Sequence, residues 1–255
     1  MTTEPVVPAL ASTVILMRDS PDGYEVFMVR RHVKSEFAAD VYVFPGGKVD
    51  EGDGVPAPYR EGEQIAVPSA DIYVVKQAAV RELFEEAGVL LAYEPDGQMV
   101  DTTRDEVGEY DRWRHDLHGG AVGMQQFASD KQLCYAHDLL HAFSHWITPV
   151  NLPRRFDTWF FTARMPDRQQ SLHDAVETTS GAWVRPGDAL RRSRDGDFPL
   201  VFATEQHLER LARYDTAADV FAGVTPEDLD PVTPKMVTNG GETRFLLPGD
   251  PGYGS

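Results

Sequence analysis

Short runs of aliphatic and β-branched residues, bounded by turn residues, predict a series of β-strands along the chain. Residues 9–17 and 24–29 are two such runs, and Pro21-Asp22-Gly23 between them is a turn signal, so together they predict a β-hairpin. Similar runs predict three later strands of the main sheet, at 142–147, 158–163 and 177–184.

Other segments carry apolar residues at helical spacing among charged ones. Residues 105–117 and 124–141 predict two helices, which we interpret as a helical insertion at about 101–141 that packs over a cleft. A further amphipathic helix is predicted at 204–213. Residues 226–255 carry repeated Pro and Gly with one apolar run at 245–247, and predict an extended tail that leaves room for one strand. This alternation of strands and helices is typical of an α/β fold.

The composition limits the classes of protein to which the chain can belong. Its 255 residues are 42% hydrophobic, which suits a single globular domain over residues 1–255 with insertions. The formal net charge of −17 disfavours nucleic acid and anionic membrane surfaces as partners, and no apolar run is long enough to span a bilayer. With one cysteine, Cys134, and no recognisable signal peptide, the chain is expected in the cytoplasm.

The stretch 78–89 predicts a helix that stops at Gly88 and carries three carboxylates on one face. At about 100° per residue, Glu85 lies about 60° to one side of Glu82, and Glu86 lies about 40° to the other. Arg81 lies one turn before Glu85 and is expected to fix that carboxylate in place. A hard divalent cation with oxygen ligands, Mg²⁺ or Mn²⁺, would relieve the repulsion between the three groups. A solvated helix face with ordinary salt bridges is the alternative.

A glycine turn upstream offers backbone groups to a ligand. The β-rich run 41–44 leads into Pro45-Gly46-Gly47, where the absence of side chains lets the backbone approach closely. Its carbonyls and amides are therefore accessible to a metal or a phosphate, and the Gly46 carbonyl is a candidate metal ligand beside the three glutamates.

Together these two segments resemble the Nudix box, G-x5-E-x7-R-E-U-x-E-E-x-G-U, in which U is aliphatic. Gly47 matches the first glycine, and residues 81–89, Arg-Glu-Leu-Phe-Glu-Glu-Ala-Gly-Val, match the second half at every specified position. The sequence departs from the box at two points. Asp53 stands in place of the isolated glutamate, and the spacer runs over residues 54–80 instead of seven residues, with the insertion assigned to about 54–70.

The split box, together with a later Trp146-Ile147-Thr148-Pro149 and the segment 155–161, is similar to the peroxisomal coenzyme A diphosphatase branch of Nudix hydrolases and its bacterial relatives. The resemblance implies a Nudix α/β/α sandwich, in which a mixed sheet lies between helices. It also implies metal-dependent hydrolysis of the diphosphate linkage in a nucleoside diphosphate linked to another group.

The substrate stays open between several small molecules. The branch suggests coenzyme A or acyl-coenzyme A, but Glu36 and Asp40 stand where the better-known coenzyme A pattern wants an arginine and a glycine. ADP-ribose, dinucleotides and nucleotide sugars are therefore alternatives. A non-catalytic Nudix-fold module that senses a nucleotide is the alternative of another class, and the complete glutamate set argues against it. A homodimer is left open.

Several further residues are candidates for the site. Glu177, on a loop ahead of a Trp-containing strand, loosely matches a glutamate that reaches the metal in Nudix enzymes; it is a candidate fourth ligand or general base, and Glu82 is the other candidate base. No histidine is assigned to metal. Four arginines are candidates for phosphate binding, with surface charge or structural pairing as the alternative: Arg30, Arg31, Arg154 and Arg155.

Overall fold

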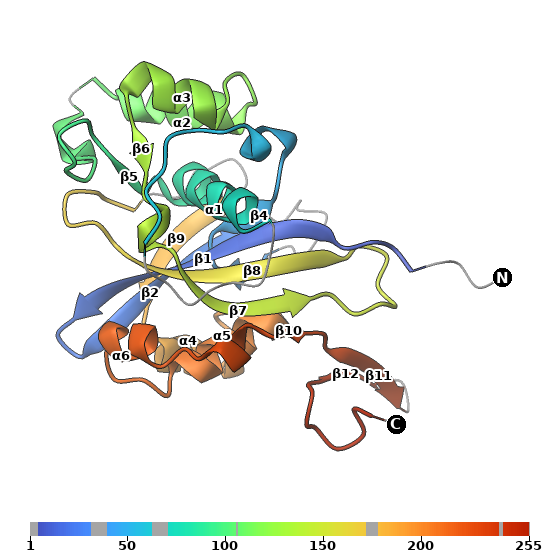
Figure 1. The fold of residues 1–255 in the computed structure, drawn as a ribbon. Coiled ribbons are helices and arrows are strands. Elements are labelled where there is room, and N and C mark those ends of the chain that lie inside the picture. Colours follow the sequence, from blue (N-terminus) through green and yellow to red (C-terminus); the bar gives the residue numbers. More distant parts are fainter. Residues whose placement is uncertain are drawn as a thin grey trace.

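A mixed β-sheet forms the centre of the molecule (Figure 1). The computed structural model describes residues 5–31, 40–62, 71–105, 107–171, 178–239 and 242–254, and the structural statements below concern these residues. The sheet contains β1 (Ala9–Ser20), β2 (Gly23–Arg31), β3 (Tyr42–Val43), β4 (Gly46–Lys48), β7 (His141–Ile147), β8 (Phe156–Arg164), β9 (Thr178–Val184) and β10 (Pro231–Val232).

The order of the strands places the glycine turn beside the first strand. The main path is β10-β7-β8-β1-β2-β3, while β4 pairs with β1 and β9 pairs with β2. The β1–β8 and β7–β10 pairs are parallel and the other pairs are antiparallel. The predicted hairpin is confirmed, because β1 and β2 pair with Ser20 opposite Gly23.

Helices cover both faces of this sheet, as Figure 1 shows. The helix α1 (Ile72–Ala87) packs on one face, and α4 (Pro186–Arg194), α5 (Phe202–Leu211) and α6 (Ala217–Ala222) pack on the other. Side chains alternate along β1, so Val14 and Leu16 join the core under α1 while Ile15 and Met17 join the opposite core. The predicted mixed sheet between helices is therefore confirmed.

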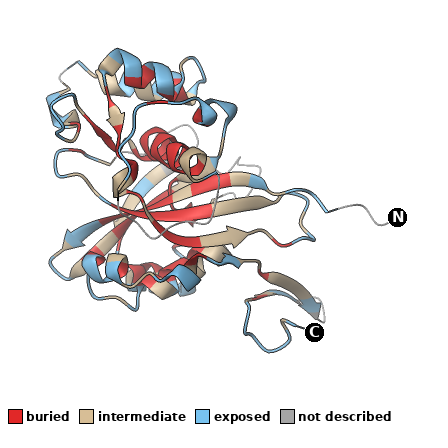
Figure 2. Cartoon of the chain, in the orientation of Figure 1, coloured by how far each residue is buried: buried red, intermediate tan, exposed pale blue. Residues whose placement is uncertain are grey.

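The helix α1 is buried for most of its length (Figure 2). It begins six residues before the segment predicted from the sequence, and every residue from Val75 to Ala87 is buried. The helix ends at Gly88, which adopts a left-handed conformation with φ of 67° and donates its N–H to the carbonyl of Phe84. The acidic residues of this helix consequently lie inside the protein, and not on a solvated face.

The helical insertion differs from its prediction in its second half. It contains α2 (Glu109–His118) and α3 (Met124–Lys131), but the prediction of helix over 124–141 is wrong beyond Lys131. Gln132 adopts a left-handed conformation, and the chain then forms β6 (Cys134–Tyr135), which pairs with β5 (Ala92–Tyr93) and buries Tyr135. Among the described residues of this half of the chain, three segments are 3₁₀ helices: η1 (Glu51–Gly54), η2 (Thr102–Arg104) and η3 (His137–Leu139).

The C-terminal segment is more ordered than an extended tail. It contains the 3₁₀ helix η4 (Pro226–Leu229), then β10 at the edge of the main sheet, then a hairpin of β11 (Lys235–Asn239) and β12 (Glu242–Leu246) that projects from the body in Figure 1. Phe245 of this hairpin stacks on Phe202 of α5, with ring centroids 5.0 Å apart. In the described part of the chain, no helix combines the length and apolarity that a bilayer span needs.

Candidate active site

The acidic face of α1 meets the glycine turn. The backbone N–H of Gly46 donates to Oε2 of Glu86 at 2.8 Å. A Cβ atom at Gly47 would lie 2.3 Å from Oε1 of Glu82, so any side chain at this position would push the carboxylate away. The two segments of the box, separated by more than thirty residues of sequence, are therefore in direct contact.

The strand pairing also determines where the Gly46 carbonyl points. The N–H of Val14 on β1 donates to the carbonyl of Pro45 at 2.8 Å, and Thr13 lies opposite Gly46. Backbone groups in an antiparallel pair alternate, so the N–H and C=O of Gly46 both face away from β1. The N–H reaches Glu86, so we expect the carbonyl of Gly46 on the same side, towards the acidic helix.

Arg81 lies at the centre of the acidic cluster. Its guanidinium donates to both oxygens of Asp53, each at 2.9 Å, and to Oε1 of Glu82 at 2.9 Å. It also donates to the carbonyl of Lys48 at 2.8 Å and to Oε2 of Glu85 at 3.3 Å. The predicted contact between Arg81 and Glu85 is present, but the carboxylate that Arg81 holds with two hydrogen bonds is that of Asp53.

Asp53 is thus more than a shortened version of the isolated glutamate of the box. Its side chain is only 1% exposed, it accepts the bidentate pair from Arg81, and it accepts the N–H of Asp50 at 2.8 Å. Bidentate arginine–carboxylate pairs fix both orientation and charge. The sequence placed Asp53 in the box but did not predict that it would hold Arg81, because the contact joins residues 28 positions apart.

The cluster contains more buried negative charge than Arg81 can neutralise. Glu82, Glu85 and Glu86 are 9%, 7% and 4% exposed. Burial raises the pKa of Glu85 to about 7, Arg81 opposes this rise, and the nearby carboxylates of Asp53 and Asp50 add to it. Crowded carboxylate oxygens of this kind are the donors that Mg²⁺ and Mn²⁺ prefer.

The donor set and the glycine corner therefore fit a divalent cation. Among the described residues, however, no three His, Cys, Asp or Glu side chains already converge as metal ligands. Glu82 and Glu85 turn towards Arg81, and Glu86 turns towards the N–H of Gly46.

The four candidate arginines lie in different surroundings. Arg30 pairs with Asp40 at 2.8 Å and lies over the ring of Tyr42, which belongs to the core on the face opposite α1. Arg155 donates to the carbonyls of Thr148 at 3.0 Å and Val6 at 2.7 Å, which ties a turn to the N-terminal segment.

The other two candidate arginines lie at the end of a strand and on a turn. Arg31 ends β2, and Arg154 is exposed on the β7–β8 turn. Glu177 lies outside the described residues. The roles of these residues in binding and catalysis stay predictions.

Two residues that the sequence did not single out reach the acidic helix from α2. Nε of Arg114 donates to the carbonyl of Glu85 at 2.8 Å, and Nδ1 of His118 lies 3.9 Å from Oε2 of the same residue. Arg114 and His118 are four residues apart, so they share one face of α2. That spacing was the only signal in the sequence, and it does not reveal which helix they face.

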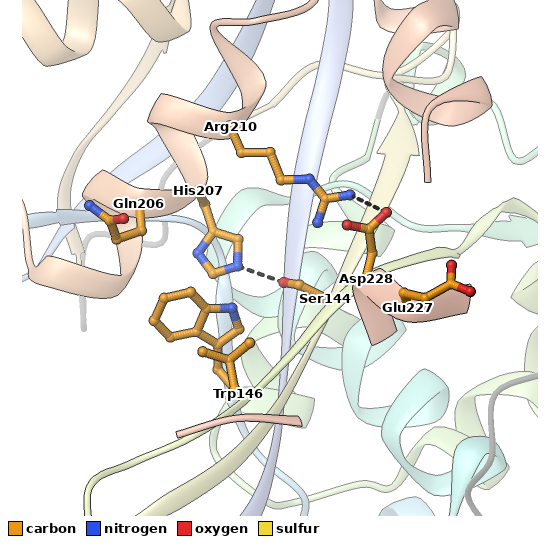
Figure 3. A pocket seen from close by; sticks show the side chains of 8 residues that line it. Ser144, Trp146, Gln206, His207, Arg210, Glu227 and Asp228 are labelled. Carbon is orange, nitrogen blue, oxygen red and sulfur yellow. Dashed lines mark hydrogen bonds and ion pairs between the residues drawn. The ribbon is translucent and has the colours of Figure 1, made fainter. Parts of the chain in front are cut away.

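The opposite face of the sheet carries a cavity of about 200 Å³ (Figure 3). Figure 3 shows the Ser144 hydroxyl directed at His207, and Arg210 directed at Asp228. Nδ1 of His207 lies 2.6 Å from the Ala203 carbonyl, which can only accept, so Nδ1 carries the proton and Nε2 accepts from Ser144 at 2.6 Å. Burial lowers the pKa of His207 to about 4, so the imidazole is neutral near pH 7.

This fold, with its glycine turn joined to the acidic helix of a split box, places the chain in the Nudix hydrolase class. The model of the NUDT19 Nudix domain family matches residues 57–211, and the chain belongs to this family. The sequence resemblance to the coenzyme A diphosphatase branch is thereby confirmed.

Individual relatives agree with this placement. An acyl-coenzyme A diphosphatase NUDT19 of Xenopus laevis is 26% identical over 240 residues, which cover 77% of this chain and 62% of that protein. The Homo sapiens protein of the same name is 25% identical, with 91% of this chain and 73% of that protein covered. The crystal structure of a Nudix hydrolase from Alicyclobacillus acidocaldarius matches with a TM-score of 0.72 and 26% identity, and covers 85% of this chain and 96% of that chain.

Proposed function

We propose that the chain is a diphosphatase that depends on Mg²⁺ or Mn²⁺ and cleaves a nucleoside diphosphate linked to another group. The contact between the Gly46-Gly47 turn and the buried carboxylates of α1 carries this proposal. A substrate diphosphate is itself anionic, and the chain has a net charge of −17, so binding requires a local positive charge. A divalent cation at the acidic face supplies that charge.

The residues of the cluster have separate proposed roles. When bound, the cation would polarise a phosphoryl oxygen and lower the pKa of a bound water. Glu82, Glu85 and Glu86 are the proposed ligands, with the Gly46 carbonyl as a further ligand. Arg81, held by Asp53, keeps the carboxylates of Glu82 and Glu85 in position.

Hydrolysis also requires a base for the attacking water. We assign this role to Glu82 or to Glu177, either of which would accept the proton as the water oxygen bonds to phosphorus. The bridging P–O bond breaks, and two phosphomonoesters leave. For the phosphates of the substrate, Arg30, Arg31, Arg154 and Arg155 are the candidate cations.

Coenzyme A or acyl-coenzyme A is the proposed substrate, because two relatives in the same family carry the name acyl-coenzyme A diphosphatase. Cleavage of coenzyme A would release adenosine 3′,5′-bisphosphate and phosphopantetheine. ADP-ribose, dinucleotides and nucleotide sugars are the competing substrates.

A panel of these compounds, incubated with Mg²⁺ and with Mn²⁺ and analysed by product mass, tests the proposal. We expect the two phosphomonoesters, formed only with metal and fastest from coenzyme A or its acyl derivatives. Cleavage of another panel compound alone would change the substrate. Tight ligand binding without any product would replace the enzyme with a nucleotide-sensing module.

A further inference from the structure

We propose that α2 of the helical insertion belongs to the active site, with Arg114 and His118 as positioning residues for Glu85. This inference rests on the proposed function, because Glu85 matters here as a ligand of the divalent cation. The helical insertion lies outside the box, and the inference gives it a role in the site. This inference follows from two contacts made by one face of α2.

Arg114 holds the backbone of the acidic turn. The last four carbonyls of an α-helix lack partners within the helix. In α1, which ends at Ala87, these carbonyls begin at Phe84, whose oxygen accepts from Gly88. The next carbonyl, that of Glu85, accepts from Nε of Arg114 at 2.8 Å. A cation at the C-terminus of a helix also interacts favourably with the helix dipole.

His118 faces the carboxylate of the same residue. Its Nδ1 lies 3.9 Å from Oε2 of Glu85, which is too long for a direct hydrogen bond but allows one bridging water. The same oxygen lies 3.3 Å from Nη1 of Arg81. The ionisable groups near the Glu85 carboxylate thus include members of three elements: Arg81 from α1, His118 from α2, and Asp53 of η1 with Asp50 just before it.

Aromatic packing fixes α2 in the orientation that these contacts require. Trp113 stacks on Phe127 of α3 with ring centroids 4.8 Å apart, and Phe127 stacks on Phe84 of α1 at 5.6 Å. Leu117, between Arg114 and His118, is buried in the same core. Because Phe84 directly precedes Glu85, the stack joins both insertion helices to the acidic turn.

The test measures Mn²⁺ affinity of the full chain at one pH, from the EPR signal of free Mn²⁺, together with the Tm without metal. Loss of a residue that orients a metal ligand lowers metal affinity by roughly tenfold to a hundredfold. We therefore expect His118→Ala and Arg114→Ala each to weaken Mn²⁺ binding about tenfold, while His118→Ala leaves the Tm unchanged. The conservative variants His118→Gln and Arg114→Lys, which keep an N–H donor, should recover most of the affinity.

A matched control lies on the same helix. His115 is exposed, and His115→Ala should bind Mn²⁺ as wild type does. Wild-type affinity in both alanine variants would overturn the inference and leave the proposed function standing. A wild-type protein that binds no Mn²⁺ would instead overturn the proposed function. If Arg114→Ala does not fold, the two His118 variants decide the question.

Discussion

On one face of the sheet Arg81 contacts the carboxylates of Asp53, Glu82 and Glu85, whereas on the other face Arg210 pairs with Asp228 at 3.0 Å. The first cluster contains more buried negative charge than its one arginine neutralises, and burial, with a smaller contribution from the nearby carboxylates, raises the pKa of Glu85 to about 7. The second cluster is matched: Arg210 meets Asp228, a neutral imidazole meets a hydroxyl, and the remaining carboxylate of the cavity, Glu227, is exposed.

This difference separates a site that needs a ligand from a cavity that does not. The region around Ser144 and His207 encloses about 200 Å³, yet the buried hydroxyl and imidazole satisfy each other. The region around α1 has more buried carboxylates than Arg81 can neutralise, and its glycine corner brings the backbone directly against them. Buried charges are stable only when they are paired or bound to metal, so the unbalanced cluster is the better candidate for catalysis.

The largest expected effect comes from Glu86. Glu86→Gln removes one charge from the proposed cation site, and we expect kcat/KM for diphosphate hydrolysis to fall about a thousandfold, equivalent to about 4 kcal/mol. The fold should remain intact by circular dichroism. Glu227→Gln, in the cavity on the other face, is the matched control and should retain full activity; equal losses in both variants would erase the distinction between the two regions.

The next effect concerns the stability of the acidic cluster. Asp53→Ala removes the bidentate partner of Arg81, and breaking a buried ion pair costs about 3 to 5 kcal/mol in the free energy of unfolding. Asp50 lies 3.6 Å from the same guanidinium and its side chain is 69% exposed, so Asp50→Ala should cost less than about 1 kcal/mol. Urea denaturation measures both values, and similar losses would show that Asp53 is not the principal partner.

The opposite face should respond to pH through His207. Its pKa falls from 6.5 to about 4 in the folded protein, because burial disfavours the charged form. As the pH falls, the unfolded chain therefore binds the proton before the folded chain does. The free energy of unfolding is highest above pH 6.5 and decreases as the pH falls towards 4, by up to about 3 kcal/mol. His207→Gln should lose less stability over this interval; an unchanged pH dependence in that variant would mean that His207 is not the titrating group.

The smallest effect is expected at Ser144. Ser144→Ala removes the hydroxyl that donates to His207 and leaves a buried acceptor without its partner, which costs about 1 to 2 kcal/mol of stability. Diphosphate hydrolysis should stay at the wild-type rate. A protein that folds normally but no longer cleaves diphosphates would move the active site to this cavity.

The sequence predicts the local features of this fold better than its long-range contacts. Gly88 as the stop of α1 and the β1–β2 hairpin followed from backbone preferences that act over a few residues. The helix predicted beyond Lys131 failed because apolar spacing alone did not reveal the left-handed Gln132 or the pairing of β6 with β5.

The same limit applies to the candidate site. The spacing of Glu82, Glu85 and Glu86 showed that they share one helical face, but not that this face is buried. The partnership of Asp53 with Arg81 and the approach of Arg114 to Glu85 join segments about thirty residues apart, and only tertiary packing produces them. Periodicity identifies faces, whereas the partners of a face depend on the whole fold.

Anomalous diffraction from crystals soaked in Mn²⁺ tests most directly whether the acidic face of α1 holds a divalent cation. We expect one strong anomalous peak at about 2 Å from carboxylate oxygens of Glu82, Glu85 or Glu86 and beside the Gly46 carbonyl. A peak elsewhere in the molecule, or none at Mn²⁺ concentrations that support catalysis, would contradict this expectation.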